Sequence, residues 1–200
     1  MLPMKLNIGC GICWLPGYLN VDKERLPQLA EWARGLGREE APLKGVDFLH
    51  FDIREPWPWQ DSSVEEVHAN QVLEHLTHAE LDHVLAETRR VLQPGAVFVG
   101  AVPDFAAIWQ AAYVEHDEWR ELPHDTAGPY PEPWMNVLQN YAHGWDHRQI
   151  FTLDMLQARL AGAGFDTFVQ IAPGRNLHFQ ARVTKPATGP QWDDEKGLSN

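Results

Sequence analysis

The chain has 200 residues, enough for one domain with a sizeable core, and its 44% hydrophobic and 22% charged residues are typical of a globular protein. No apolar run approaches the length of a membrane span, and Met1 to Lys5 leads straight into a predicted strand, so we expect no secretory signal and a cytoplasmic protein. The net charge of -12, with Arg89-Arg90 as the only basic pair, argues against a nucleic acid substrate.

The first quarter of the chain predicts three strands and one helix. Met4 to Ile8 is a short apolar strand that ends at the turn Gly9-Cys10-Gly11. Tyr18 to Asp22 predicts a second strand. Only about ten residues separate the two strands, so the usual crossover helix must be short or replaced by a loop. Pro27 to Leu36 has helical spacing of its apolar residues, and Val46 to Phe51 predicts the third strand.

The middle of the chain continues this alternation. Val64 to Ala69 predicts a fourth strand, and Thr77 to Glu80 fits the capping box that starts a helix. Ala96 to Val102 is continuously apolar, which is typical of a strand buried on both faces. Phe105 to Val114 has a helical pattern. We therefore expect a mostly parallel sheet covered by helices on both faces.

The C-terminal part begins with a change in composition. From residue 115 to 145 the chain is rich in aromatic residues, proline and histidine without clear periodicity, so we interpret 105–146 as an inserted lid. Thr152 to Ala163 predicts a helix, and Phe165 to Ile171 and Leu177 to Val183 predict two closing antiparallel strands. We expect one domain over 1–184 and a disordered polar tail over 185–200.

Polar and small residues follow several of the predicted strands. Ligands of such sheets bind outside the carboxyl ends of the strands. That rule gathers the following residues at one edge: Gly9, Gly11, Asp22, Asp52, Gln71 and Asp104.

These residue types suit an adenosine ligand. Gly9 and Gly11 let the backbone approach a ligand closely. Asp22 can accept hydrogen bonds from both hydroxyls of a ribose. Asp52 can accept from an adenine amino group, while the backbone amide of Ile53 donates to the ring. A glycine turn with two acids, each at a strand end, therefore favours a cofactor that carries adenosine.

Two other nucleotide motifs are excluded. The dinucleotide fingerprint G-x-G-x-x-G fails because Trp14 occupies the third glycine position, which argues against a nicotinamide enzyme. No G-x-x-x-x-G-K-[ST] loop is present, so the chain is not a P-loop nucleotidase.

The two cysteines leave an alternative open. Cys10 and Cys13 have C-x-x-C spacing, which would suit a thiol oxidoreductase. The simpler reading makes Cys10 a small residue between two glycines, with Cys13 packed nearby. No second cysteine pair exists to complete a zinc site, and we expect no metal.

Several segments together resemble class I S-adenosylmethionine-dependent methyltransferases, and they are most similar to small predicted methyltransferases of the methyltransferase-11-like group. The segments that carry the resemblance are Leu6 to Gly11, Pro16 to Asp22, Asp61 to Val67, Val72 to Leu76, Glu87 to Gly95, Val102 to Asp104 and Gly162 to Phe165. The resemblance implies a Rossmann-like α/β fold with a seven-stranded, mostly parallel sheet and an antiparallel last strand.

The resemblance also implies the cofactor, S-adenosyl-L-methionine, and roles for residues in this chain. The turn from Gly9 through Cys10 to Gly11 would hold the methionine part of the cofactor. Asp22 would hold the ribose, and Asp52 and Ile53 the adenine. Asn70 and Gln71 would face the methionine moiety and the sulfonium. Asn7 stands where many members carry an acid, so contact with the cofactor amino group is replaced there or relayed by water.

The acceptor side is less defined by the sequence. Methyl transfer needs a base only if the acceptor must lose a proton, and histidine suits this role near neutral pH. His75, His143 and His147 are the candidates. The last two, with His116 and His124, could alternatively bind a metal, form a pocket wall or lie on the surface.

Two functions other than thiol chemistry follow from this pattern. The first is a methyltransferase that acts on a small molecule, for which a sugar-derived acceptor is suggested by family association only. The second is a module that binds S-adenosylmethionine or a nucleoside without transferring a methyl group. The sequence does not fix the oligomeric state.

Overall fold

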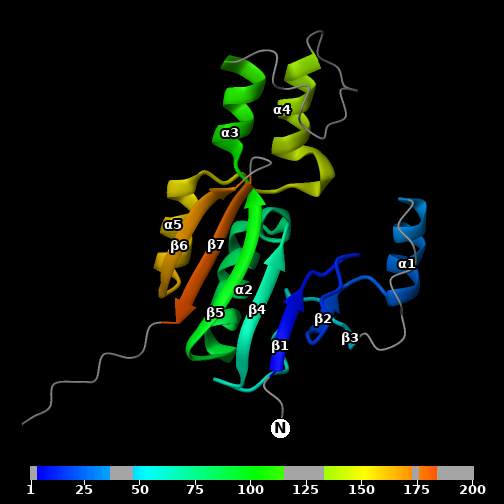
Figure 1. Ribbon diagram of the computed structural model, residues 1–200, viewed down its shortest axis with the longest axis vertical. Helices are drawn as coiled ribbons and strands as arrows, with labels where there is room; N and C mark the ends of the chain where they lie inside the picture. The colour runs from blue at the N-terminus through cyan, green and yellow to red at the C-terminus, as the bar shows by residue number, and fades with distance from the viewer. Residues whose placement is uncertain (1–3, 37–46, 115–132, 173–175, 184–200) are drawn as a thin grey trace, which may run out of the picture.

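A computed structural model of the chain describes residues 4–36, 47–114, 133–172 and 176–183. Its centre is a seven-stranded sheet with the order β3-β2-β1-β4-β5-β7-β6 (Figure 1). β7 runs antiparallel to both of its neighbours, and the other pairs are parallel. The expected sheet with an antiparallel last strand is therefore confirmed. The strands are β1 (Met4–Ile8), β2 (Leu19–Asp22), β3 (Phe48–His50), β4 (Val64–Asn70), β5 (Leu92–Pro103), β6 (Phe165–Ala172) and β7 (Asn176–Val183).

The helices follow the predicted order with one addition. They are α1 (Leu26–Gly35), α2 (His78–Val91), α3 (Phe105–Trp109), α4 (Pro133–His143) and α5 (Leu153–Gly162), with the short turns η1 (Leu73–His75), η2 (Gln110–Val114) and η4 (Gly144–Asp146). The predicted capping box starts α2, because the Thr77 hydroxyl accepts from the Glu80 amide and the Glu80 carboxylate accepts from the Thr77 amide. Within the described ranges no helix is both long and apolar enough to cross a bilayer.

One face of the sheet is more apolar and more deeply buried than the other. Along β7, Leu177 and Phe179 are buried, whereas the alternating His178, Gln180 and Arg182 are exposed. α2 and α5 lie behind the strands in Figure 1, against the apolar face. None of the described helices crosses the front of the sheet. The prediction of helices on both faces is therefore wrong for this part of the chain.

The connection between β1 and β2 explains part of this difference. Residues 9–18 form a loop without a helix, so no helical layer starts there. Two buried amides hold the loop instead. The Asn7 Nδ2 group donates to the Asn20 Oδ1 atom and to the Cys13 carbonyl, each at 2.8 Å, and Asn20 Oδ1 also accepts from the Leu15 amide. α1 follows β2 and stands beside the sheet edge (Figure 1).

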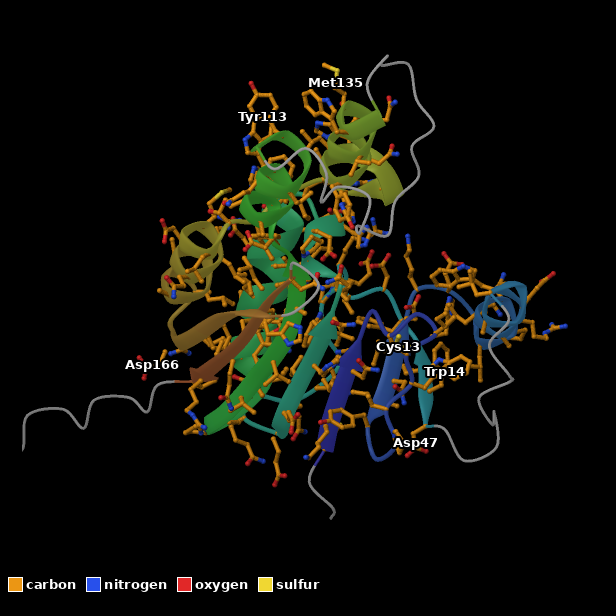
Figure 2. The ribbon with its side chains drawn as sticks, turned by 45° about the horizontal axis from the view of Figure 1, so that its top comes forward. Cys13, Trp14, Asp47, Tyr113, Met135 and Asp166 are labelled. Carbon is orange, nitrogen blue, oxygen red and sulfur yellow. The ribbon has the colours of Figure 1, made fainter. Side chains whose placement is uncertain are left out.

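The segment after β5 contains a helix that we did not predict. α4 carries Trp134, Val137, Leu138 and Tyr141 on one stripe, and these pack with Ile108 of α3. α3 and α4 stand beyond the carboxyl ends of the central strands, and Figure 2 shows Tyr113 and Met135 near their far ends. The expected lack of periodicity over 115–145 is thus wrong for α4, whose residues have the i, i+3, i+4, i+7 spacing of a helix.

Both ends of this segment lie together at the sheet. Asp104 and Phe151 form an isolated parallel bridge, and the Phe105 amide donates to the Phe151 carbonyl at 2.9 Å. The lid interpretation of 105–146 stays a prediction, and its residues 115–132, with His116 and His124, lie outside the described residues. The predicted tail over 185–200 also lies outside them.

Candidate functional site

A cavity of about 390 Å³ lies at the carboxyl ends of β1, β2 and β4. This volume is in the range of pockets that bind small molecules. Among the residues singled out in the sequence, those that line it are Gly9, Gly11, Asp22, Asp52, Ile53, Gln71 and His75. The edge predicted from strand order is therefore where the structure brings most of them together.

Asp22 is held at this edge by backbone amides. Its side chain is buried, and its two carboxylate oxygens accept from the Gly11 amide and the Glu24 amide, each at 2.8 Å. These bonds connect the end of β2 to the turn after β1 and fix the carboxylate where it lines the cavity. The site therefore contains an oriented acid, which can accept further hydrogen bonds from a ligand.

The turn after β1 needs glycine for two reasons. Gly9 and Gly11 have positive φ angles of 58° and 49°, which residues with a side chain rarely adopt. A Cβ atom on Gly9 would also lie 2.8 Å from a methyl group of Val72, which lines the same cavity. The turn and the start of η1 are therefore packed directly against each other at the cavity floor.

Asp52 belongs to a chain of ion pairs along the cavity. The Arg54 guanidinium donates to the Asp52 carboxylate at 2.6 Å and contacts Glu80 at 3.4 Å. Glu80 also lies 4.0 Å from Arg148. The hydrogen bond from Arg54 is the main reason that the pKa of Asp52 is below its usual range. Asp52 therefore lines the cavity as a carboxylate already paired with Arg54.

Gln71 follows β4 in a strained conformation. Its φ angle is 56°, and its amide donates to the Ala101 carbonyl at 2.8 Å. Such backbone strain is often stored at functional sites. Its neighbour Asn70 is exposed at the end of β4 and does not line the cavity within the described residues.

Asn7 and Cys10 lie beneath the turn. Asn7 is 2% exposed, its amide is used by Asn20 and the Cys13 carbonyl, and its Oδ1 lies 3.0 Å from His68 Nδ1. Cys10 is also buried. Neither side chain lines the cavity in the described part of the chain, so Asn7 supports the loop from below.

The two cysteines differ in environment. Cys10 is buried, and burial followed by the nearby Asp22 charge raises the pKa of its thiol to about 12. Cys13 is exposed on the loop (Figure 2). A thiol that stays protonated at pH 8 is a poor nucleophile, which disfavours the oxidoreductase alternative.

We therefore expect iodoacetamide to label one of the two thiols of the native protein at pH 8. Cys13 should react, and Cys10 should react only after unfolding, which intact-mass and peptide mass spectrometry will measure. Cys13→Ser should leave no rapidly labelled thiol. Rapid labelling of Cys10 in the folded protein would contradict its burial and its high pKa.

The three candidate histidines occupy different environments. His75 is half-buried and lines the cavity, and burial, followed by the nearby His147, lowers its pKa, so it is neutral near pH 7. His147 is 9% exposed and packs against the His75 ring, with the centroids 5.0 Å apart. His143 is exposed at the end of α4 and does not line the cavity. His75 is the one of the three that both lines the cavity and can accept a proton.

Sequence reasoning missed several residues of the site. Lys23, Trp32, Arg54, Val72 and Arg148 also line the cavity. Trp32 lies within the predicted helix from Pro27 to Leu36, and an aromatic ring in the first helix after the second strand could have indicated a cavity wall. Arg148 comes from a distant segment, and no local pattern marks it.

Glu74 was also missed as a functional candidate. Its side chain is 1% exposed, and burial raises its pKa to about 8. It lies beside His75 in η1 and next to the buried His147. A glutamate side chain is rarely buried this deeply in a globular protein unless it has a partner.

Comparisons with known proteins agree with this geometry. Residues 6–100 match a family model described as a methyltransferase domain. A solved S-adenosylmethionine-dependent methyltransferase from Mesorhizobium loti is 16% identical, with a TM-score of 0.56 and 90% of both chains covered. The PH0226 protein from Pyrococcus horikoshii OT3 is 15% identical, with a TM-score of 0.57 and with 90% of this chain and 82% of that chain covered.

Other similar structures are longer. The match to the CurJ carbon methyltransferase has 13% identity and a TM-score of 0.56, and it covers 92% of this chain but 49% of that one. The chain likewise spans 62% of a similar protein from Bordetella parapertussis. No curated protein matches the sequence. At these identities the solved structures establish the fold.

Proposed function

We propose that this chain transfers a methyl group to a small-molecule acceptor, because residues 6–100 match the model of a methyltransferase domain and the sheet has the class I methyltransferase fold. The family implies S-adenosylmethionine as the cofactor. The observation that carries the proposal is the buried Asp22 carboxylate, oriented by two backbone amides at the cavity edge.

The residues around the cavity fit the polar groups of this cofactor. Asp22 would accept hydrogen bonds from the ribose hydroxyls, and Gly9 and Gly11 leave room for the backbone to approach the methionine part. Asp52 and Ile53 line the cavity on the β3 side, where they would contact the adenine. Gln71, on the opposite side at the end of β4, would face the methionine moiety.

The chemistry needs little beyond alignment from the protein. S-adenosylmethionine supplies an already activated methyl group. The chain must hold the acceptor in line with it, and proximity of this kind carries much of the rate. His75 is neutral near pH 7 and lines the cavity, so it would take the proton of an acceptor that must lose one.

Isothermal titration calorimetry with S-adenosylmethionine and S-adenosylhomocysteine tests the proposal. We expect both to bind at one site per chain, with ATP and NAD binding at least about tenfold more weakly because the cavity has neither phosphate loop nor dinucleotide fingerprint. Chelator-treated protein should be used, so that bound metal does not affect the result. Absence of binding by S-adenosylmethionine would overturn the proposal.

A further inference from the structure

We infer that Glu74, His75 and His147 form a site for a divalent transition-metal ion of the zinc class. The potential ligand atoms of the three side chains all lie within 4.8 Å of one another. This site uses none of the contacts proposed for the cofactor, and it does not require the proposed function. It shares His75 with the proposed base, so His75 takes the acceptor's proton only when no metal is bound. From the sequence we expected no metal, since no second cysteine pair completes a zinc site, and the histidines weighed as ligands there were His116, His124, His143 and His147.

The first observation is the state of the Glu74 carboxylate. Both of its oxygens are buried and have no hydrogen-bond partner among the described residues, and the side chain is 1% exposed. Leaving a buried carboxyl group without partners is costly, and natural proteins rarely do so without a function. A bound cation would satisfy both its charge and its lone pairs.

The second observation is that backbone contacts build the cluster from two distant segments. The Glu74 carbonyl accepts from the Arg148 amide at 2.8 Å and from the Gln149 amide at 3.0 Å. The Gln149 side chain donates to the Leu76 carbonyl at 2.7 Å. These bonds hold His147 beside η1, so the three side chains meet because the backbone is fixed on both sides of them.

The third observation concerns the two imidazoles. His147 Nδ1 lies 2.7 Å from the Tyr141 carbonyl, and His75 Nδ1 lies 3.4 Å from the Asp146 carbonyl. A carbonyl oxygen only accepts, so each Nδ1 carries the proton and each Nε2 carries the lone pair. Histidines that bind metals are usually oriented in this way, with the other ring nitrogen donating to a carbonyl or carboxylate.

The donor set selects the type of metal. Two imidazoles and one carboxylate suit zinc or a similar first-row ion better than magnesium or calcium, which prefer oxygen ligands. Zinc–ligand distances of about 2.0–2.1 Å place tetrahedral ligands roughly 3.4 Å apart. From separations of up to 4.8 Å the three atoms must therefore approach by up to about 1.4 Å, which side-chain rotation can supply, and a fourth position would remain for water or another ligand.

The place of the cluster between two cavities indicates from which side a fourth ligand would reach the metal. His75 lines the large cavity, whereas Glu74 and His147 line a second cavity of about 10 Å³, which holds one water molecule at most. The cluster thus forms part of the wall between the two spaces. If the proposed function holds, a ligand on the His75 side would lie on the acceptor side of the cofactor site.

Cobalt titration of tag-free, chelator-treated protein without S-adenosylmethionine tests the inference. We expect one equivalent of Co²⁺ to give visible absorption bands, and one equivalent of Zn²⁺ to abolish them. Glu74→Gln and His147→Gln should each weaken Co²⁺ binding at least about 100-fold, since even loss of an outer contact costs 10–100-fold. His143→Gln changes an exposed histidine outside the cluster and should bind like the wild type.

The outcomes of this titration distinguish a specific metal site from no site. Circular dichroism melting identifies a variant that fails to fold, in which case the other ligand variant is used. No stoichiometric binding by the wild type, equal binding by a folded Glu74→Gln variant, or equal loss in His143→Gln would overturn the inference. The metal titration contains no S-adenosylmethionine, so a failure to bind Co²⁺ would not contradict the proposed methyl transfer. The calorimetry uses chelator-treated protein, so a failure to bind S-adenosylmethionine would not contradict the metal site.

Discussion

Replacing Asp22 with alanine is expected to raise the dissociation constant for S-adenosylmethionine roughly 100-fold or more. A hydrogen bond to a charged group contributes about 1.5–3 kcal/mol, and two ribose hydroxyls would share this carboxylate, so a loss of about 3 kcal/mol is the minimum. The change also removes the acceptor of the Gly11 and Glu24 amides, which loosens the turn on the other side of the cofactor. Calorimetry with S-adenosylmethionine and S-adenosylhomocysteine measures the effect.

Asp104→Asn is the matched control for this experiment. Asp104 is also a buried carboxylate at the end of a strand, and it accepts from the Ala106 amide and the Ala107 amide. It does not line the large cavity in the described residues, because it caps α3 instead. We expect this variant to melt at a lower temperature with an unchanged dissociation constant. Equal affinities for wild type and a folded Asp22→Ala would contradict the assigned role.

Gly100→Ala is expected to lower the free energy of unfolding by about 4 kcal/mol or more. Gly100 lies in β5 at the centre of the sheet, opposite Ala69 of β4 and Phe179 of β7. A Cβ atom there would overlap the Ala69 carbonyl and lie 2.7 Å from the Phe179 ring. The Ala69 carbonyl is backbone and cannot rotate away, so the strands themselves must separate. Urea unfolding monitored by tryptophan fluorescence measures the loss.

Gly162→Ala shows whether this effect comes from the contact or from losing a glycine. Gly162 ends α5, and a Cβ atom there would have no atom within 4 Å. We expect its free energy of unfolding to stay the same or to rise by up to about 1 kcal/mol, because alanine reduces the entropy of the unfolded chain. A Gly100→Ala protein as stable as this control would refute the proposed overlap.

The strands and the edge they form were predictable because local patterns determine them. The short apolar runs before Gly9 and Asp22 place both residues at carboxyl ends of parallel strands, and the structure brings them into contact through the Gly11 amide. The capping box at Thr77 likewise specified the start of α2 from four residues. In each case the residues in contact are at most 11 positions apart in the sequence.

The parts that were missed depend on contacts between distant segments. Asn7 was expected to matter for the cofactor, but it pairs with Asn20 and supports the loop that replaces a crossover helix. Glu74 acquires its significance only when His147, more than seventy residues later, is placed beside it. Helix α4 is a different case, since its stripe from Trp134 to Tyr141 was present in the sequence and was hidden by the prolines and aromatic residues around it.

The bridge between Asp104 and Phe151 has a consequence for chimeric proteins. Because the bridge holds the two ends of residues 105–150 together beyond the end of β5, this stretch is a cassette whose replacement need not disturb the strand order. That cassette contains Arg148 of the large cavity and His147 of the proposed metal site, whereas Asp22 and the glycine turn lie outside it. Chimeras that exchange residues 105–150 would therefore replace His147 and Arg148 while they keep Glu74, His75 and the cofactor end, so the proposed metal site would persist only where the donor also supplies the third ligand.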